Sequence, residues 1–116
     1  MNDTKVIYAK ANTPLLSIAQ QYNLPLARIF EFNDMKEVET LAKDQLIFLQ
    51  RKRKTGTNEY HIVKEGETLH DIAQEEALRL ESLLGYNQLG ERMRPAAGEQ
   101  LYLRSNAPAQ PRLVRN

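Results

Sequence analysis

Two histidines are the side chains of this sequence best suited to acid–base chemistry near neutral pH. His70 directly precedes Asp71, and adjacent residues on the helix expected there point in different directions, so the two do not form a catalytic dyad. His61 lies in a short β-prone run, where a position at the surface or at a strand edge is the ordinary interpretation. The absence of cysteine excludes disulfides and thiolate metal sites. The sequence therefore predicts that the chain is not an enzyme, with no catalytic residue, no metal site and no cofactor.

The segment around the histidines, YHIVKEGETLHDIA at positions 60–73, contains signals for a strand, a turn and a helix in that order. Tyr60–Val63 is rich in β-branched and aromatic residues, and Gly66 supplies the backbone freedom to turn out of a strand. Thr68 can cap a helix, with Asp71 three residues later as the acidic half of a capping box. The apolar positions of this helix recur at spacings of three and four, at Leu69, Ile72 and Ala73.

The residues that follow continue this pattern. A second amphipathic segment carries Leu80 and Leu84 and ends at Asn87. PAAGEQLYL (95–103) then supplies a proline, a glycine and a closing strand. Residues 60–104 thus resemble a lysin motif (LysM) repeat, a small βααβ module whose family binds glycans built on N-acetylglucosamine.

The first half of the chain repeats the second. An offset of 54 residues pairs the apolar helix positions of the two halves and pairs Asn33 with Asn87. The matched helix positions are Leu15 with Leu69, Ile18 with Ile72, and Ala19 with Ala73. In the first copy Thr13 and Pro14 are expected to start a helix. Asn33 is expected to end the second helix, because asparagine tolerates the left-handed cap conformation.

These elements predict an α+β fold of two tandem βααβ modules, each with a two-stranded antiparallel sheet and two short helices. The first LysM-like repeat spans residues 5–50 and is degenerate, and the second spans 60–104. Residues 51–59, RKRKTGTNE, hold no apolar side chain and are expected to form a basic, solvated linker. Residues 105–116 include two prolines and are expected to form a flexible tail.

Charge and hydropathy argue against two classes of partner. Residues 1–50 hold five Lys and Arg against six Asp and Glu, and residues 59–104 hold five against nine, so both folded parts are neutral to acidic. A nucleic-acid-binding face needs clustered positive charge on structured elements. The RKRK run alone fits such a function, but a solvated linker is the preferred interpretation. The longest aliphatic or aromatic run, Leu46–Leu49, is far shorter than the about 20 residues of a membrane span.

The LysM resemblance also implies where a sugar binds. In the family, the loop from the first strand into the first helix and the segment leaving the second helix form a shallow groove for acetamido groups, which backbone amides and carbonyls can match. In the second copy the implied contact residues are Gly66, Glu67, Thr68, Leu69, Asn87, Gln88 and Leu89. Most of these residues also have an ordinary structural interpretation, as part of a turn, a helix cap, a core position or a helix end. Glu67 and Gln88 have no evident internal partner.

The first copy departs from the family pattern. Its implied groove residues are Asn12, Thr13, Pro14, Leu15, Asn33, Asp34 and Met35. Pro14 has no amide hydrogen in the loop expected to hold the ligand, and Lys43 stands where the second copy has Gly98. This groove is therefore expected to bind weakly, to bind an altered ligand, or to serve as a scaffold.

The resemblance implies non-catalytic binding of N-acetylglucosamine-containing polysaccharide, peptidoglycan or a chitin-like glycan, with two grooves acting through avidity. Pairs of LysM repeats are commonly attached to cell-wall hydrolases. Because the first ten residues lack an apolar core of signal-peptide length, the chain is expected to be a fragment of a longer exported bacterial protein, with a hydrolase upstream, in the periplasm, in the cell envelope or secreted. The alternative is a protein-interaction or spacer module that has lost its sugar groove.

Overall fold

A computed structural model describes residues 1–115 of the chain. They form two compact units: unit 1 contains Met1 and Asp3–Lys52, and unit 2 contains Asn2 and the chain from Arg53 onwards. The described residues hold four short α-helices and two antiparallel two-stranded sheets, with one sheet and two helices in each unit. The predicted α+β class is thus confirmed. Within residues 1–115, no helix is long and apolar enough to cross a bilayer.

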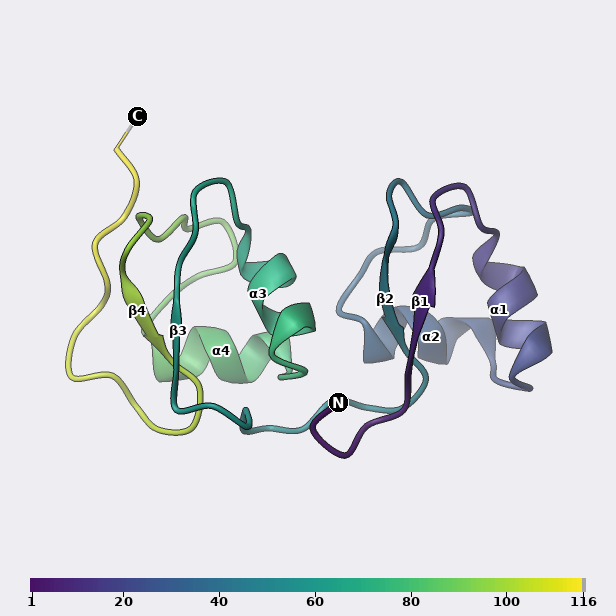
Figure 1. The fold of residues 1–116 in the computed structure, drawn as a ribbon, viewed down its shortest axis with the longest axis horizontal. Helices are drawn as coiled ribbons and strands as arrows, with labels where there is room; N and C mark the ends of the chain where they lie inside the picture. The colour runs from purple at the N-terminus through teal and green to yellow at the C-terminus, as the bar shows by residue number, and fades with distance from the viewer. Residues whose placement is uncertain (116) are drawn as a thin grey trace. The chain divides into compact units, whose positions relative to one another are not determined.

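Unit 1 has the order strand, helix, helix, strand (Figure 1). Its elements are β1 (Val6–Ala9), α1 (Leu15–Gln21), α2 (Leu26–Phe32) and β2 (Gln45–Phe48). The strands pair antiparallel, from Val6 opposite Phe48 to Ala9 opposite Gln45. In Figure 1 both helices lie on the same side of this small sheet.

Unit 2 repeats this order (Figure 1). Its elements are β3 (Tyr60–Ile62), α3 (Leu69–Glu75), α4 (Leu80–Tyr86) and β4 (Gln100–Tyr102). The strands pair antiparallel with Tyr60 opposite Tyr102 and His61 opposite Leu101. The residues between β3 and α3 and those between α4 and β4 form the loops that the LysM resemblance assigns to sugar binding.

Corresponding positions of the two copies form the two cores. Leu15 on α1 and its counterpart Leu69 on α3 are buried, with 0% and 5% of their surface exposed, and so are Ile18 and its counterpart Ile72. Ile47 on β2 and Leu101 on β4 are fully buried. Burial of one such side chain stabilises a fold by about 1.5–3 kcal/mol, so a few of them at one centre can hold a unit of this size. The internal repeat of the sequence is therefore a repeat of the core.

Asn33 and Asn87 hold the same place in the two units. Asn33 donates from Nδ2 to the carbonyls of Ile29 (2.7 Å) and Phe48 (3.0 Å), and its Oδ1 accepts from the Phe48 amide (2.7 Å). Asn87 makes the corresponding hydrogen bonds to α4 and β4. Both side chains are fully buried, so each asparagine ties the end of its helix to the closing strand.

The prediction of a left-handed cap at Asn33 is wrong. Its φ is −107°, and the φ of Asn87 is −111°. The left-handed residues are the next ones along the chain, Asp34 (51°) and Gln88 (57°). Hydrogen bonds in both directions hold the asparagine in the last helical turn, and the chain reverses one residue later.

The predicted capping box at the start of α3 is confirmed. The Thr68 hydroxyl accepts from the Asp71 amide, and the Asp71 carboxylate accepts from the Thr68 amide, both at 3.0 Å. At the start of α1 the N-cap residue is Pro14 rather than Thr13, and it has no side chain that could cap. The first helix of each unit, α1 or α3, therefore begins differently, although the two helices contribute corresponding residues to their cores.

Residues 51–59 do not form a solvated linker throughout. Lys52 is 1% exposed, and its Nζ lies 2.8 Å from the Asp34 carboxylate within unit 1. Burial lowers the pKa of Lys52, and the hydrogen bond and charge of Asp34 oppose that effect. Within unit 2, the Gly56 amide donates to the Leu103 carbonyl at 2.9 Å. The segment is thus divided between the two units rather than standing apart from them.

The end of the chain lies against unit 2. The Ala107 amide donates to the Tyr86 carbonyl at 2.7 Å. Further along, residues 112–114 are hydrogen-bonded antiparallel to residues 94–96, and Leu113 packs against the core. The segment expected to be a flexible tail is therefore paired with the loop between α4 and β4.

Candidate functional site

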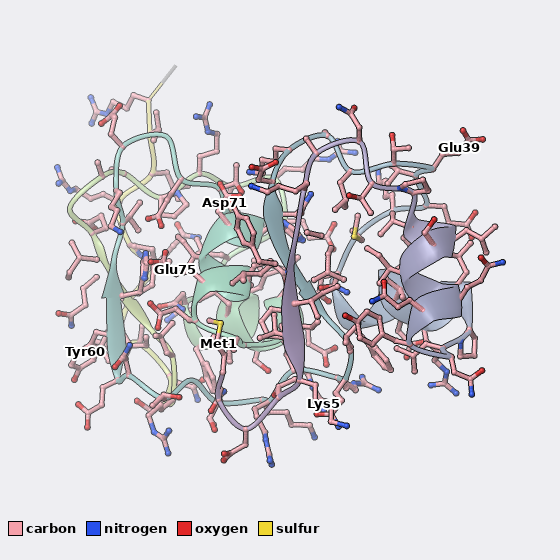
Figure 2. All side chains as sticks on the ribbon, turned by 45° about the vertical axis from the view of Figure 1, so that its right-hand side comes forward. Met1, Lys5, Glu39, Tyr60, Asp71 and Glu75 are labelled. Atoms are coloured by element: carbon pink, nitrogen blue, oxygen red, sulfur yellow. The ribbon has the colours of Figure 1, made fainter. Side chains whose placement is uncertain are left out.

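Unit 1 contains a hollow of about 810 Å³ that is lined mainly by apolar side chains. Its lining residues are Pro14, Leu16, Leu26, Ala27, Phe30, Glu37, Val38, Glu39 and Thr40. They come from the start of α1, from α2 and from the segment that leaves α2. Figure 2 shows Glu39 beside the start of α1. Because two loops and the helix between them converge here, this hollow is the candidate binding site of unit 1.

The two loops beside the hollow are hydrogen-bonded to each other. The Leu15 amide donates to the Glu39 carbonyl at 3.0 Å, and the Leu41 amide donates to the Thr13 carbonyl at 3.1 Å. These bonds fix the separation of the loops. They also engage the amides of Leu15 and Leu41, so a ligand in the hollow depends more on the side chains at its rim.

Of the residues implied for the groove of unit 1, Pro14 alone lines the hollow. Three others belong to the core or to its hydrogen bonds, namely Leu15, Asn33 and Met35. Asp34 forms the ion pair with Lys52. Asn12 and Thr13 form the turn out of β1, where Asn12 has a φ of 69° and donates its amide to the Leu41 carbonyl.

The sequence prediction missed most of this hollow. Leu16 and Val38 line it and remain 53% and 45% exposed. Leu16 follows a buried leucine on α1, and Val38 lies in an otherwise polar segment. A large apolar residue outside the buried stripe of a short helix, close to a second one in a loop, is the signal that could have found the site.

In unit 2 several implied groove residues have structural roles. Leu69 and Leu89 belong to the core, and Asn87 is fully buried. Thr68 serves as the helix cap. Gly66 is exposed and has a φ of 79°, a conformation that favours glycine. Among the residues of this loop that the resemblance assigns to sugar contact, Gly66 thus has its backbone at the surface and no role in the core.

Glu67 and Gln88 have internal partners that the sequence did not reveal. Glu67 Oε1 lies 2.9 Å from His61 Nε2 and accepts from the Lys64 amide at 2.8 Å. The Gln88 side chain donates to the Ala107 carbonyl at 3.2 Å. Both side chains are therefore hydrogen-bonded within unit 2.

His61 lies between two carboxylates. The residue is 6% exposed, and its Nδ1 lies 2.6 Å from Glu76 Oε2 while Nε2 faces Glu67. Burial lowers the pKa of His61, but the hydrogen bonds and charges of Glu67 and Glu76 outweigh burial and raise that pKa above its ordinary value of 6.5. Burial raises the pKa of Glu67, whereas the bonds to His61 and Lys64 hold it below 4.5. The interpretation of His61 as a surface residue is wrong, because the imidazole is buried and connects β3 to the residues on either side of α3. His61 does lie on an edge strand, since β3 belongs to a two-stranded sheet.

The two candidate grooves differ in the partner of one loop. In unit 1, residues 39–41 are hydrogen-bonded to residues 13–15. In unit 2 the corresponding segment, residues 94–96, is bonded to residues 112–114 instead. Different backbone groups are therefore engaged at the two sites.

Comparison with known proteins gives a family for unit 2. The LysM domain family matches residues 61–104. These residues are a LysM domain. The matched range contains α3, α4 and β4 and all of β3 except Tyr60. No curated protein matches the chain.

Two solved structures of spore cortex-lytic enzymes named SleL are similar to this chain. The Bacillus cereus enzyme is 23% identical over 89% of this chain, with a TM-score of 0.39. The Bacillus megaterium QM B1551 enzyme is 19% identical over 93% of this chain, with a TM-score of 0.37. The chain spans only 23% and 24% of the length of these two proteins.

Unit 1 and the LysM domain share their element order, their core positions and their buried asparagine. They differ at the loop before the first helix, where the LysM domain has Gly66 and a capped helix and unit 1 has Asn12 and Pro14. The hollow of unit 1 offers apolar surface together with the carboxylates of Glu37 and Glu39. That combination suits a ligand with both methyl and hydroxyl groups.

Proposed function

We propose that this chain binds N-acetylglucosamine-containing polysaccharide without catalysing a reaction, and that peptidoglycan is its ligand. The LysM domain at residues 61–104 supports the ligand class, because LysM domains bind such glycans and are not catalytic. The observation that carries the proposal is the hollow of unit 1. It lies between the two segments that form the sugar groove in the LysM family.

The lining of the hollow suits an N-acetyl sugar. Leu16 and Val38 offer apolar surface to an acetyl methyl, and burial of one such group contributes about 0.8 kcal/mol. Glu37 and Glu39 can accept hydrogen bonds from sugar hydroxyls. Each contact is weak, but on a repeating polymer a second site engages at high effective concentration. A long glycan is therefore expected to bind more tightly than a short one.

We further propose that the chain directs a cell-wall hydrolase to its substrate and acts outside the cytoplasm. The support is the LysM domain, since domains of this family occur in cell-wall proteins outside the cytoplasm and are commonly attached to such hydrolases. In this arrangement the binding units hold the polymer and the attached domain carries out the chemistry.

A spacer or protein-interaction module is the second candidate function. The observation that favours it is the use of loop groups within each unit: the amides of Asn12 and Leu15 bond the opposite loop, and Glu67 and Gln88 have internal partners. A module of this kind positions a neighbouring domain and needs no free groove.

Co-sedimentation of the full chain with insoluble peptidoglycan and with chitin separates the two functions. A glycan binder pellets with the polymer and is released by N-acetylglucosamine oligomers. A spacer stays in the supernatant at every salt concentration. Pelleting that the oligomers do not reduce also contradicts the proposed function, because it indicates adsorption without a sugar site.

A matched pair of variants connects binding to the hollow. Val38 lines it and is 45% exposed, whereas Val114 lies in unit 2, outside the hollow, and is 44% exposed. Val38→Asp is expected to weaken pelleting at least about fivefold, because a charge replaces the apolar rim. Val114→Asp makes the same chemical change and is expected to leave pelleting unchanged.

A further inference from the structure

Unit 2 contains a cluster of polar side chains centred on His61. The imidazole is 5% exposed, with Nδ1 2.6 Å from Glu76 Oε2 and Nε2 2.9 Å from Glu67 Oε1. A third carboxylate belongs to Glu75: one donor atom from each of His61, Glu67 and Glu75 lies within 4.8 Å of the other two. In Figure 2 the side chain of Glu75 lies between α3 and β3.

Most of this group is already held in place by the fold. His61 stands on β3, opposite Leu101. Glu67 Oε1 accepts from the Lys64 amide at 2.8 Å, and Glu76 Oε1 accepts from the Asn58 side chain at 3.0 Å. A ligand for this cluster therefore has to order only Glu75, whose side chain is 50% exposed.

The charges of the cluster do not balance. Three carboxylates, Glu67, Glu75 and Glu76, surround one imidazole. Lys64 Nζ lies 3.7 Å from Glu75 Oε1, but the Lys64 side chain is 70% exposed and easily exchanged for another cation. A partly buried site with excess negative charge favours a small cation that carries more than one charge.

The donor set indicates which cation. An imidazole nitrogen is a ligand that suits zinc and related transition metals, which also accept carboxylate oxygens, whereas calcium and magnesium prefer oxygen ligands alone. At metal sites the other ring nitrogen of a ligating histidine almost always donates to a carboxylate, a backbone carbonyl or water, which fixes the tautomer and the ring orientation. Glu76 holds Nδ1 of His61 in this way.

We propose that unit 2 binds one divalent transition-metal ion of the Zn²⁺ class through His61 Nε2, Glu67 and Glu75, with Glu76 orienting the imidazole. The ion replaces the proton shared by Nε2 and Glu67, and that proton is released to solvent. Water fills the remaining coordination position. The site departs from the sequence-based prediction of no metal site, since residues this far apart in sequence meet only in the folded unit.

Calorimetric titration of the tag-free full chain, stripped of metal, with ZnCl₂ in a weakly coordinating buffer tests the proposal. We expect one ion per chain and no comparable heat with CaCl₂. Glu75→Gln removes one ligand at a half-exposed position, so the chain still folds, and we expect zinc binding at least about tenfold weaker.

Two control variants alter residues outside the cluster. Glu65→Gln neutralises an exposed carboxylate of the same loop, and His70→Gln removes the other histidine. Both are expected to leave zinc affinity unchanged. Zinc is also expected to move the ¹⁵N resonance of His61 Nε2 in the unaltered protein. Absence of saturable binding, an unmoved resonance, or equal weakening by Glu65→Gln and Glu75→Gln overturns the proposal.

Discussion

The side-chain amide of Asn87 exchanges two hydrogen bonds with the backbone of Tyr102. Its Nδ2 donates to the Tyr102 carbonyl at 2.8 Å, and its Oδ1 accepts from the Tyr102 amide at 2.7 Å. Two paired residues of an antiparallel sheet make the same exchange, so Asn87 satisfies the edge of β4 from the end of α4. Asn33 does this for Phe48 in unit 1, and each copy thus joins its second helix to its closing strand through one side chain.

Asn87→Ala is expected to lower the free energy of unfolding of unit 2 by about 3 kcal/mol. The substitution leaves the partly buried amide and carbonyl of Tyr102 without that partner, and a polar group left unsatisfied on burial costs about 1–3 kcal/mol. Urea unfolding followed by the amide NMR signals of unit 2 measures the change. The control Asn106→Ala alters an exposed asparagine and is expected to stay within about 0.5 kcal/mol of the unaltered chain. Equal effects of the two substitutions would contradict this role for Asn87.

Without metal, His61 is expected to make the stability of unit 2 depend on pH. Because the folded state raises the pKa of His61 above 6.5, its contribution is complete below pH 6.5 and is lost as the pH rises through the raised value. Glu67 has a lowered pKa, so its contribution is present above pH 4.5 and is lost as the pH falls through the lowered value. Unit 2 should therefore resist urea best between pH 4.5 and 6.5.

His61→Gln tests the histidine part of this pH dependence. It is expected to remove the decline in urea resistance above pH 6.5, since glutamine does not titrate. The measurement is a series of urea midpoints in chelator-containing buffers, with His70→Gln as the matched control. A decline that persists in His61→Gln would assign the effect to other groups.

The buried pair of Lys52 and Asp34 predicts an unequal response to removal of either partner. Lys52→Met replaces the ammonium with an apolar chain of similar size and is expected to change the stability of unit 1 by no more than about 1 kcal/mol. Asp34→Asn keeps the left-handed backbone but leaves the 1% exposed ammonium without its carboxylate, and is expected to cost about 3 kcal/mol. Urea unfolding, monitored by the amide NMR signals of unit 1, measures the loss of stability in each variant. A larger loss for Lys52→Met would show that the pair itself stabilises the unit.

Deletion of residues 112–116 is expected to destabilise unit 2 by about 2 kcal/mol. It removes Leu113 from the core and breaks the hydrogen bonds to residues 94–96. Hydrogen exchange of the Ala96 amide should become faster, because its acceptor is the Arg112 carbonyl. A shorter deletion of residues 115–116 leaves these contacts in place and serves as control. Unchanged exchange at Ala96 after the longer deletion would mean that the segment is not paired in solution.

The elements of the fold could be predicted because their signals are local. The spacing of Leu69, Ile72 and Ala73 predicts a helix, and Thr68 with Asp71 predicts where it starts. All of these residues lie within two helical turns. Because the first half of the chain repeats the second, the same elements could be assigned to the first copy.

The contacts that define the sites could not be predicted because they join distant parts of the chain. Glu76 reaches His61 across fifteen residues, and residues 112–114 pair with 94–96 although neither segment has a strand pattern. The rim of the hollow at Val38 lies in a segment without periodicity. Such pairings depend on how β1, β3 and the loops pack, which side-chain spacing alone does not encode.

The central claim is that the hollow of unit 1 holds an acetylated sugar, and an NMR titration of the ¹⁵N-labelled full chain with an N-acetylglucosamine tetramer tests it most directly. The claim predicts saturable shifts concentrated at Leu16 and residues 37–40, and their loss in Val38→Asp but not in Val114→Asp. Absence of shifts at these residues, or equal binding by Val38→Asp and the unaltered chain, would contradict it.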